Sequence, residues 1–275
     1  MSKHRSDTIG GRQPCGGLVL KSAREIALMR KAGAVVYRVL DHMKEMAKPG
    51  AVTRDLNRRA EEIIAQAGAT ALFKGVVNPQ ARYPFPAALC ISVNEEIVHG
   101  IPGDRALCEG DIVSIDCGVR LNGYCGDAAV TLAVGAVSAA ARHLMDVTRQ
   151  VLELAIREIA PGTSWSEIAG KMQRFVEENN LSVVRDFVGH GIGRKMHEDP
   201  KIPNFWDGRG RNEDFRLQEG MVLAIEPMVN LGSHLTRGTA DSWTVTTRDG
   251  EPSAHFEHTV AVTRDGADVL TDGRS

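Results

Sequence analysis

Apolar side chains recur every three to four positions in four stretches of the chain, which is the spacing of amphipathic helices. The first stretch opens at Ser22-Ala-Arg-Glu25, a capping box, and is followed by Pro49-Gly50. The fourth opens at a second capping box, Ser164-Trp-Ser-Glu167, just after Pro161-Gly162. The pattern predicts helices over residues 22–48, 53–68, 138–159 and 164–180.

Apolar runs predict strands, and these runs repeat within the chain. Leu107–Asp116 matches Leu217–Glu226 at five positions with a constant offset of 110 residues, and each run ends in a carboxylate. Asp127-Ala-Ala-Val130 likewise matches Glu257-His-Thr-Val260. We therefore expect an α+β fold in which two related halves of one domain face each other. The predicted strands are residues 111–119, 124–134, 221–229 and 254–263.

The composition excludes several classes of protein. The chain has 275 residues, with 33 Lys and Arg against 35 Asp and Glu, and this formal charge of −2 is too balanced for a nucleic-acid module. No apolar run approaches the roughly 20 residues that span a bilayer. The five Cys residues form no CxxC pair, which favours free thiols in a reducing compartment.

The N-terminal residues are polar and Gly-rich, without the apolar segment of a secretory signal. We expect residues 1–20 to be a flexible tail, residues 21–275 to form a single domain, and the protein to be cytoplasmic.

Four carboxylates lie inside apolar runs that should form strands: Asp116, Asp127, Glu226 and Glu257. Asn122-Gly123 is a typical hairpin turn, and a hairpin centred there makes Asp116 and Asp127 diagonal neighbours on one face. In that register Asp116 lies opposite Ala129, and Gly118 lies opposite Asp127. One buried acid alone would suggest an ion pair or an edge position. Four acids at repeat-related positions favour a pair of divalent cations, because unpaired buried carboxylates are costly and repel one another.

Three histidines can complete such a site. His190 lies among glycines that let the backbone approach closely, and His197 and His99 are nearby candidates. Carboxylates with one imidazole suit Mn²⁺, Fe²⁺ or Co²⁺ at least as well as Zn²⁺, and two such ions support metal-assisted hydrolysis. Four other histidines are interpreted as ordinary surface, helix or loop residues: His4, His42, His143 and His234.

The ordered set of these acids and His190 resembles the metal ligands of methionine aminopeptidases, in metallopeptidase family M24. The resemblance extends from about Lys21 to Thr271 and implies the pita-bread fold, with two pseudo-symmetric halves around a dinuclear metal site. Glu226 and Glu257 are 31 residues apart, which is similar to type I, since the second type has a helical insert there. The motifs are Ser92–Pro102, Asp116-Cys-Gly, Gly126-Asp127, Gly189–Gly193 with His197, Ile225-Glu-Pro227 and Phe256–Thr259.

The resemblance implies a catalytic domain that removes the N-terminal Met of nascent polypeptides when a small residue follows. It implies two divalent ions (Co²⁺, Mn²⁺, Fe²⁺ or Zn²⁺), with Glu226 also moving a proton and His99 and His197 contacting the substrate. The implied metal ligands are Asp116, Asp127, His190, Glu226 and Glu257. The Met pocket would be lined by Cys90, Phe85 and Trp243, although ordinary core packing explains Trp243 equally well.

Nascent chains are therefore the expected partners, with transient contact to the ribosome. We expect no direct contact with nucleic acid or membrane, and a monomer.

The chain departs from the family pattern around the pocket. Residues 74–82 do not align clearly, Phe85 replaces a common Tyr, and Met196 replaces a frequent aromatic residue. His255 stands where many members have Gln and would add a titratable group near the metals. The alternative functions are a related Xaa-Pro aminopeptidase or dipeptidase, usually larger by an N-terminal domain, a non-catalytic pita-bread binding protein, and a structural metal site.

Overall fold

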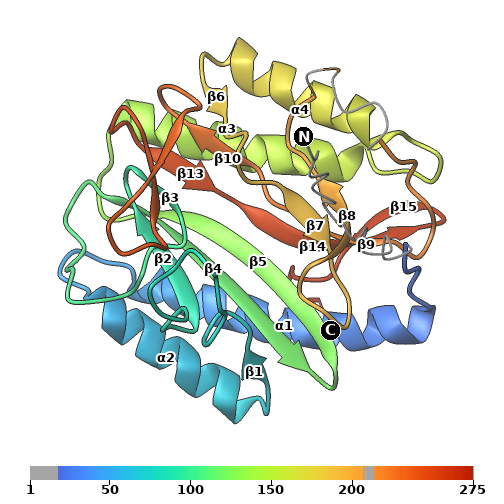
Figure 1. Cartoon of the computed structure of the whole chain (residues 1–275), viewed down its shortest axis with the longest axis horizontal. Coiled ribbons are helices and arrows are strands. Elements are labelled where there is room, and N and C mark those ends of the chain that lie inside the picture. Colours follow the sequence, from blue (N-terminus) through green and yellow to red (C-terminus); the bar gives the residue numbers. More distant parts are fainter. Residues whose placement is uncertain (1–17, 207, 209–213, 275) are drawn as a thin grey trace, which may run out of the picture.

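The computed structural model of the chain describes residues 18–206, 208 and 214–274, and Figure 1 shows the arrangement of its elements. Residues 1–17 of the expected tail lie outside the described residues. Within the described part there are four α-helices, and each lies where the hydrophobic pattern predicts one. They are α1 (Ala23–Met46), α2 (Thr53–Gln66), α3 (Ala139–Arg157) and α4 (Trp165–Glu178).

One of the two predicted capping boxes is confirmed and the other is wrong. At α1, the Ser22 hydroxyl accepts from the Glu25 N–H, and the Glu25 carboxylate accepts from the Ser22 N–H. At α4, the Ser164 side chain makes no capping hydrogen bond within the described residues. Asp214 instead accepts from the Ser166 N–H at 2.9 Å and from the Ser166 hydroxyl at 2.7 Å. A local sequence pattern cannot predict a cap that a distant loop supplies.

The centre of the molecule is a sheet of nine strands, counted over the described residues, in the order β1-β4-β5-β14-β9-β7-β8, with β2 also on β4 and β15 on β14. Its strands are β1 (Thr70–Ala71), β2 (Leu89–Val93), β4 (Ile112–Leu121), β5 (Tyr124–Ala133), β7 (Gly189–Gly191), β8 (Glu198–Ile202), β9 (Val222–Ile225), β14 (Glu257–Thr263) and β15 (Gly266–Val269).

Two smaller sheets accompany it, with strand orders β13-β10-β6 and β11-β12-β3. Their strands are β3 (Glu96–Val98), β6 (Ser182–Val183), β10 (Met228–Asn230), β11 (Thr236–Gly238), β12 (Val245–Thr247) and β13 (Ser253–His255).

The predicted hairpin is confirmed residue by residue. β4 and β5 pair in antiparallel register, with Asp116 opposite Ala129 and Gly118 opposite Asp127. The turn residue Asn122 has a φ of 52° and Gly123 a φ of 81°, the left-handed conformation that a two-residue turn of this kind requires.

Two predicted strands are each divided in the structure. The run 221–229 is interrupted at Glu226-Pro227, so that β9 joins the large sheet and β10 joins a small one. The run 254–263 is interrupted at Phe256, between β13 and β14. Both breaks lie beside a predicted acidic ligand. Proline cannot donate to a ladder, which explains the first break; the hydrophobic pattern alone marks neither.

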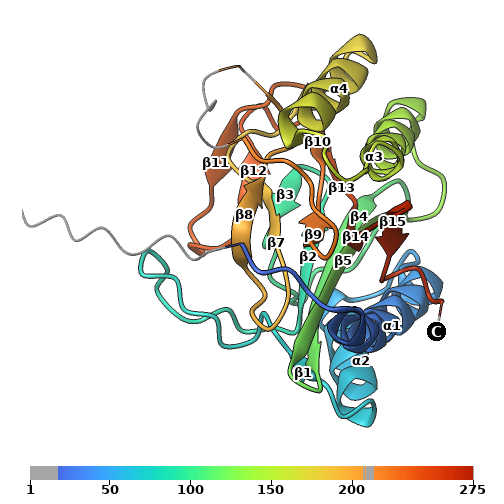
Figure 2. The same cartoon turned by 90° about the vertical axis from the view of Figure 1, so that its right-hand side faces the viewer.

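The internal repeat appears in the packing of the core. One hydrophobic cluster joins α1 and α2 to β2, β4 and β5, and another joins α3 and α4 to β9 and β14. Val130 packs against both clusters, at the place where the two halves meet. In Figure 2, α1 and α3 lie on one side of the large sheet, and β11 and β12 of a small sheet lie on the other.

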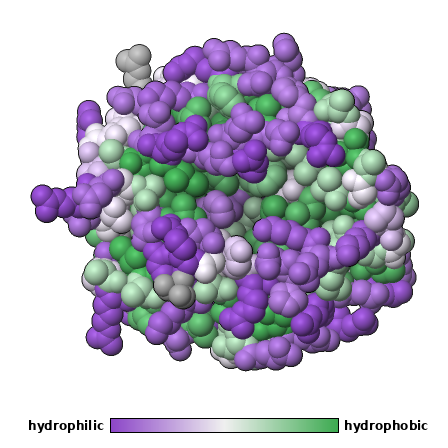
Figure 3. All heavy atoms as spheres, turned by 180° about the vertical axis from the view of Figure 1, so that it is seen from behind, coloured by the Kyte–Doolittle hydropathy of each residue, from purple (hydrophilic) through white to green (hydrophobic). Residues whose placement is uncertain are grey.

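The helical face of the molecule is hollowed between α1 and α3, where apolar residues gather (Figure 3). The hollow is a cavity of about 330 Å³ whose lining includes Leu40 of α1, Leu152 of α3 and Phe256. Among the described helices, none is long and apolar enough to cross a membrane.

Candidate metal centre

The predicted acidic ligands meet because three adjacent strands carry them in register. Asp116 on β4 lies opposite Ala129 on β5, and Ala129 lies opposite Glu257 on β14. Asp127 lies two residues before Ala129 on β5, so its side chain projects from the same face. The first half of the chain thus contributes two aspartates, and the second half brings Glu257 beside them.

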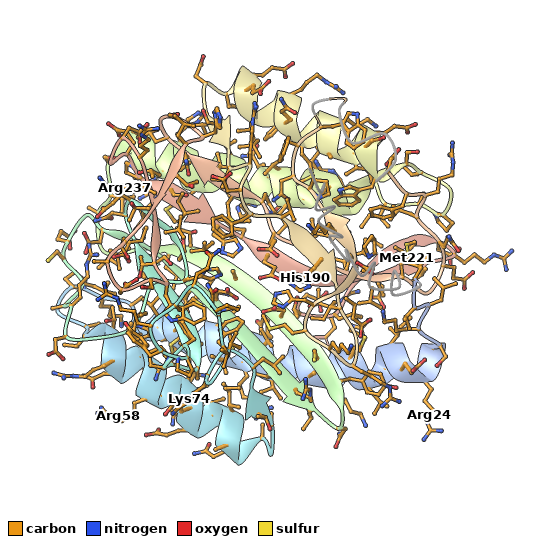
Figure 4. The ribbon with its side chains drawn as sticks, in the orientation of Figure 1. Arg24, Arg58, Lys74, His190, Met221 and Arg237 are labelled. Atoms are coloured by element: carbon orange, nitrogen blue, oxygen red, sulfur yellow. The ribbon has the colours of Figure 1, made fainter. Side chains whose placement is uncertain are left out.

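Glu226 and His190 complete the cluster from the neighbouring strands. Glu226 follows the last residue of β9, and His190 on β7 lies opposite Ala224 of β9. Figure 4 places His190 near the middle of the molecule, among the strands of the large sheet. Ligand atoms of Asp127, His190 and Glu257 all lie within 4.8 Å of one another, a spacing that can hold a metal ion.

The cluster is buried, and several of its oxygen atoms are unsatisfied. Asp127 is 1% exposed and Glu257 is 3% exposed. Within the described residues, Asp116 Oδ1, Asp127 Oδ1 and Glu257 Oε1 have no hydrogen-bond partner. Orphaned carboxylate oxygens at such depth are costly unless they bind a cation. The residues therefore fit a divalent metal ion.

The electrostatics agree with this conclusion. Burial, with the neighbouring carboxylates, raises the pKa of Asp116, Glu226 and Glu257 well above the ordinary range, and burial raises the pKa of Asp127 to about 7. Without a cation these groups would retain protons near neutral pH. A divalent ion provides the positive charge that allows them to ionise together.

His190 is prepared to bind a metal through one ring nitrogen. Its Nδ1 lies 3.0 Å from the Gly191 carbonyl, which can only accept, so Nδ1 carries the proton and Nε2 keeps its lone pair. Burial, together with His197, lowers the pKa of His190 to about 4, so the ring is neutral near pH 7. A hydrogen-bonded, neutral imidazole is the usual form of a metal-ligating histidine.

All ten predicted site residues line one cavity of about 120 Å³. The acids and His190 form one wall, and apolar side chains with His99 and His197 form the rest. The predicted members are Phe85, Cys90, His99, Asp116, Asp127, His190, His197, Glu226, Trp243 and Glu257. Sequence reasoning did not identify Phe73 and Val76, which also line the cavity. They lie in and beside the stretch that aligns poorly with the family, and no periodicity marks them.

The apolar part of the cavity is built around Trp243. Its ring meets Phe85 edge to face at 5.2 Å, and its Nε1–H donates to the Tyr83 carbonyl at 2.9 Å. Met196 and Cys90 pack with this group. Trp243 is thus part of a small cluster that faces the cavity, separate from the two large cores.

The two histidines outside the ligand set pack against different neighbours. The His197 ring is 4.4 Å from that of His190, and His99 packs edge to face on Phe187 at 5.6 Å. His99 has a φ of 60°, an unusual backbone conformation for a residue other than glycine. Burial, then His197, lowers the pKa of His99 to about 4.

The departure noted at His255 also lies at the site. His255 is 2% exposed, and its Nε2 lies 3.7 Å from Glu226 Oε2. Burial is the main cause that lowers the pKa of His255 to about 3, so the ring is neutral. The expected extra titratable group is therefore in place beside one of the predicted ligands.

Comparisons with known proteins agree with the geometry. The model of metallopeptidase family M24 matches residues 27–264. The methionine aminopeptidase of Clostridium perfringens is 50% identical over 255 residues, which cover 92% of this chain and 98% of that protein.

Solved structures show the same relationship. The crystal structure of methionine aminopeptidase from Thermotoga maritima has a TM-score of 0.87 and 41% identity, covering 93% of this chain and 99% of that one. A prolidase from Pyrococcus horikoshii shares the fold at 20% identity with a TM-score of 0.71, and the match covers 64% of its chain. The expected pita-bread fold is confirmed. The chain belongs to metallopeptidase family M24.

Proposed function

We propose that this protein is a methionine aminopeptidase, which removes the N-terminal Met from polypeptides whose second residue is small by metal-assisted hydrolysis of the first peptide bond. One observation carries the proposal: a buried acidic cluster that fits a divalent metal shares one small cavity with an apolar pocket. The relatives named methionine aminopeptidase match over almost their whole length, which supports the same specificity.

The chemistry follows from the groups that line the cavity. Divalent metals supply Lewis acidity, which polarises a carbonyl and provides a nucleophile near neutral pH. In the proposal Asp116, Asp127, His190, Glu226 and Glu257 hold two such ions, drawn from Mn²⁺, Fe²⁺, Co²⁺ and Zn²⁺.

Glu226 takes the proton of the attacking water and delivers it to the nitrogen of the departing amine. His197 and His99 donate hydrogen bonds to the reacting amide, which stabilises the developing oxyanion.

The pocket explains a preference for methionine. The apolar part of the cavity lies beside the acidic cluster and suits an unbranched apolar side chain. Phe85, Cys90 and Trp243 supply its apolar wall, and Met196 adds a flexible one. The substrates are the N-termini of nascent polypeptides, met in the cytoplasm by a monomeric enzyme in transient contact with the ribosome, without direct binding to nucleic acid or membrane.

The test uses metal-stripped protein reloaded with Mn²⁺, Co²⁺, Fe²⁺ or Zn²⁺ and four peptides. We expect release of Met from a Met-Ala peptide and little from Met-Leu or acetyl-Met peptides, since the second residue must be small and the amine must be free. The Ala-Pro peptide tests the prolidase alternative. Cleavage of Ala-Pro in preference to Met-Ala would reject the proposal.

A further inference from the structure

The two halves of the large sheet are joined by a short seam, the pairing of β5 with β14. Within the described residues this ladder consists of Glu257 opposite Ala129 and His258 opposite Ala128. If the register continued, Thr259 would face Asp127 beyond one end, and Thr131 would face His255 beyond the other. Each of these pairs joins a threonine to a residue of the metal centre.

At the Asp127 end of the ladder, a threonine hydroxyl makes the two hydrogen bonds that a backbone pair would otherwise make. Thr259 Oγ1 accepts from the Asp127 N–H at 3.0 Å and donates to the Asp127 carbonyl at 2.8 Å. Thr259 is fully buried, and its own N–H donates to the Thr271 hydroxyl at 3.2 Å. One side chain thus satisfies both backbone groups of a predicted metal ligand.

The second end repeats the arrangement with the strands exchanged. Thr131 Oγ1 on β5 accepts from the His255 N–H at 2.8 Å and donates to the His255 carbonyl at 2.9 Å. Because the single hydroxyl proton of Thr131 is used there, Ser114 must donate the bond that joins their hydroxyls at 2.8 Å. The residue held in this way is the one whose ring faces Glu226.

We propose that Thr259 and Thr131 are positioning residues of the metal centre. Their hydroxyls hold the backbones of Asp127 and His255 at a set offset across the seam, and so fix how closely ligands from the two halves approach one ion. Both hydroxyls bond to backbone groups and neither belongs to the predicted ligand set. Partners that orient metal ligands in this indirect way are worth about ten- to a hundred-fold in metal affinity when they are removed.

The inference rests on the proposed metal-dependent function, but its test measures metal binding by the protein. Mn²⁺ binding to the metal-stripped full chain is followed by isothermal titration calorimetry, and the symmetry of the bound ion by electron paramagnetic resonance. The variants are Thr259→Val and Thr131→Val, which keep the shape of the side chain and remove the hydroxyl, and the corresponding serine variants, which keep the hydroxyl. Thr148→Val is the matched control, because Thr148 is a fully buried threonine of α3 whose hydroxyl, among the described residues, bonds within its own helix to the Leu144 carbonyl.

We expect both valine variants to bind Mn²⁺ about ten- to a hundred-fold more weakly with an altered resonance spectrum, while their serine counterparts and Thr148→Val stay close to wild type. Wild-type affinity in the valine variants, or an equal loss in Thr148→Val, would overturn the proposal. Valine variants that do not fold, as judged by circular dichroism, would also overturn it, because the hydroxyls would then belong to the fold alone. A wild-type protein that binds Mn²⁺ but releases no Met would reject the proposed function and leave this inference standing.

Discussion

At the scale of single residues, the site separates groups that bind metal from groups that act on the substrate. Asp127 is 1% exposed and has an oxygen without a partner among the described residues, as a ligand should. His197 is exposed, and its ring lies 4.4 Å from that of His190. The two residues share a cavity, but their environments indicate different roles.

We predict that Asp127→Asn abolishes both metal binding and turnover, because the amide cannot supply a negatively charged oxygen to the metal. We predict that His197→Ala lowers kcat by about 10² to 10⁴ with metal content unchanged, since it removes a hydrogen bond to the reacting amide. Metal content by mass spectrometry and steady-state kinetics on a Met-Ala peptide measure both effects. His42→Ala is the control, because His42 is a half-buried residue of α1 whose ring, within the described residues, hydrogen-bonds to the Arg38 carbonyl of the same helix. Metal lost from His197→Ala would instead make His197 a ligand.

At the scale of elements, the close approach of α1 to β5 sets the position of β5, the strand that carries Asp127. A Cβ added at Gly126 on β5 would lie 2.7 Å from the Gly33 nitrogen of α1, and one at Gly33 would lie 2.0 Å from the Leu270 carbonyl oxygen. The backbone of α1 therefore contacts the backbone of β5 directly, with no side chain between them, at the residue next to Asp127. Periodicity predicts α1 and the hairpin separately, but their contact through paired glycines is a tertiary feature.

We predict that Gly126→Ala destabilises the protein by about 1–3 kcal/mol or more, because two backbone segments would have to separate. Gly170→Ala is the contrasting substitution. Gly170 lies inside α4, and the nearest atom to an added Cβ is Arg174 Nη1 at 3.5 Å, at the end of a flexible side chain. Alanine there should stabilise the helix by about 0.5–1 kcal/mol. Urea denaturation of the metal-free variants gives both values, and a neutral Gly126→Ala would contradict the packing described.

At the scale of the whole molecule, the metal centre joins the two halves. Asp116 and Asp127 come from the first half, and His190, Glu226 and Glu257 come from the second, while the backbone ladder between β5 and β14 is short. A bound ion therefore acts as a crosslink between halves that have separate hydrophobic cores. Stability and metal binding should be linked through the protons of the buried acids.

We predict that the wild type loses stability relative to Asp127→Asn as the pH of the metal-free proteins rises from about 4 to about 7, a difference in which the opposite contribution of the buried neutral histidines cancels. The pKa of Asp127 is raised to about 7 in the folded protein from an ordinary value of 3.8, so its protonated form favours folding below that range, and this contribution is lost as the pH passes 7.

Metal binding must displace the same protons, so Mn²⁺ affinity should rise over the same interval. A concentration one hundred times the dissociation constant should add about 2.7 kcal/mol of stability. Thermal melts of the wild type and Asp127→Asn across this pH range, with Mn²⁺ added to the wild type in a second series, measure both effects. A metal-free wild type that gains stability relative to Asp127→Asn towards pH 7 would contradict the assignment.

The sequence by itself determined the helices, the β4–β5 hairpin and the four acidic residues of the site, because periodicity, turn residues and misplaced carboxylates are local signals. Its resemblance to a family supplied the pocket residues Cys90, Phe85 and Trp243, which no spacing could identify. Only the tertiary structure decided that β9 and β10 enter different sheets, that Asp214 caps α4, and that Phe73 and Val76 complete the cavity. It also brought the hydroxyls of Thr259 and Thr131 into hydrogen bonds with the backbones of Asp127 and His255 on the facing strand. These features depend on contacts between segments far apart in the chain, and such contacts leave no periodic trace in the sequence.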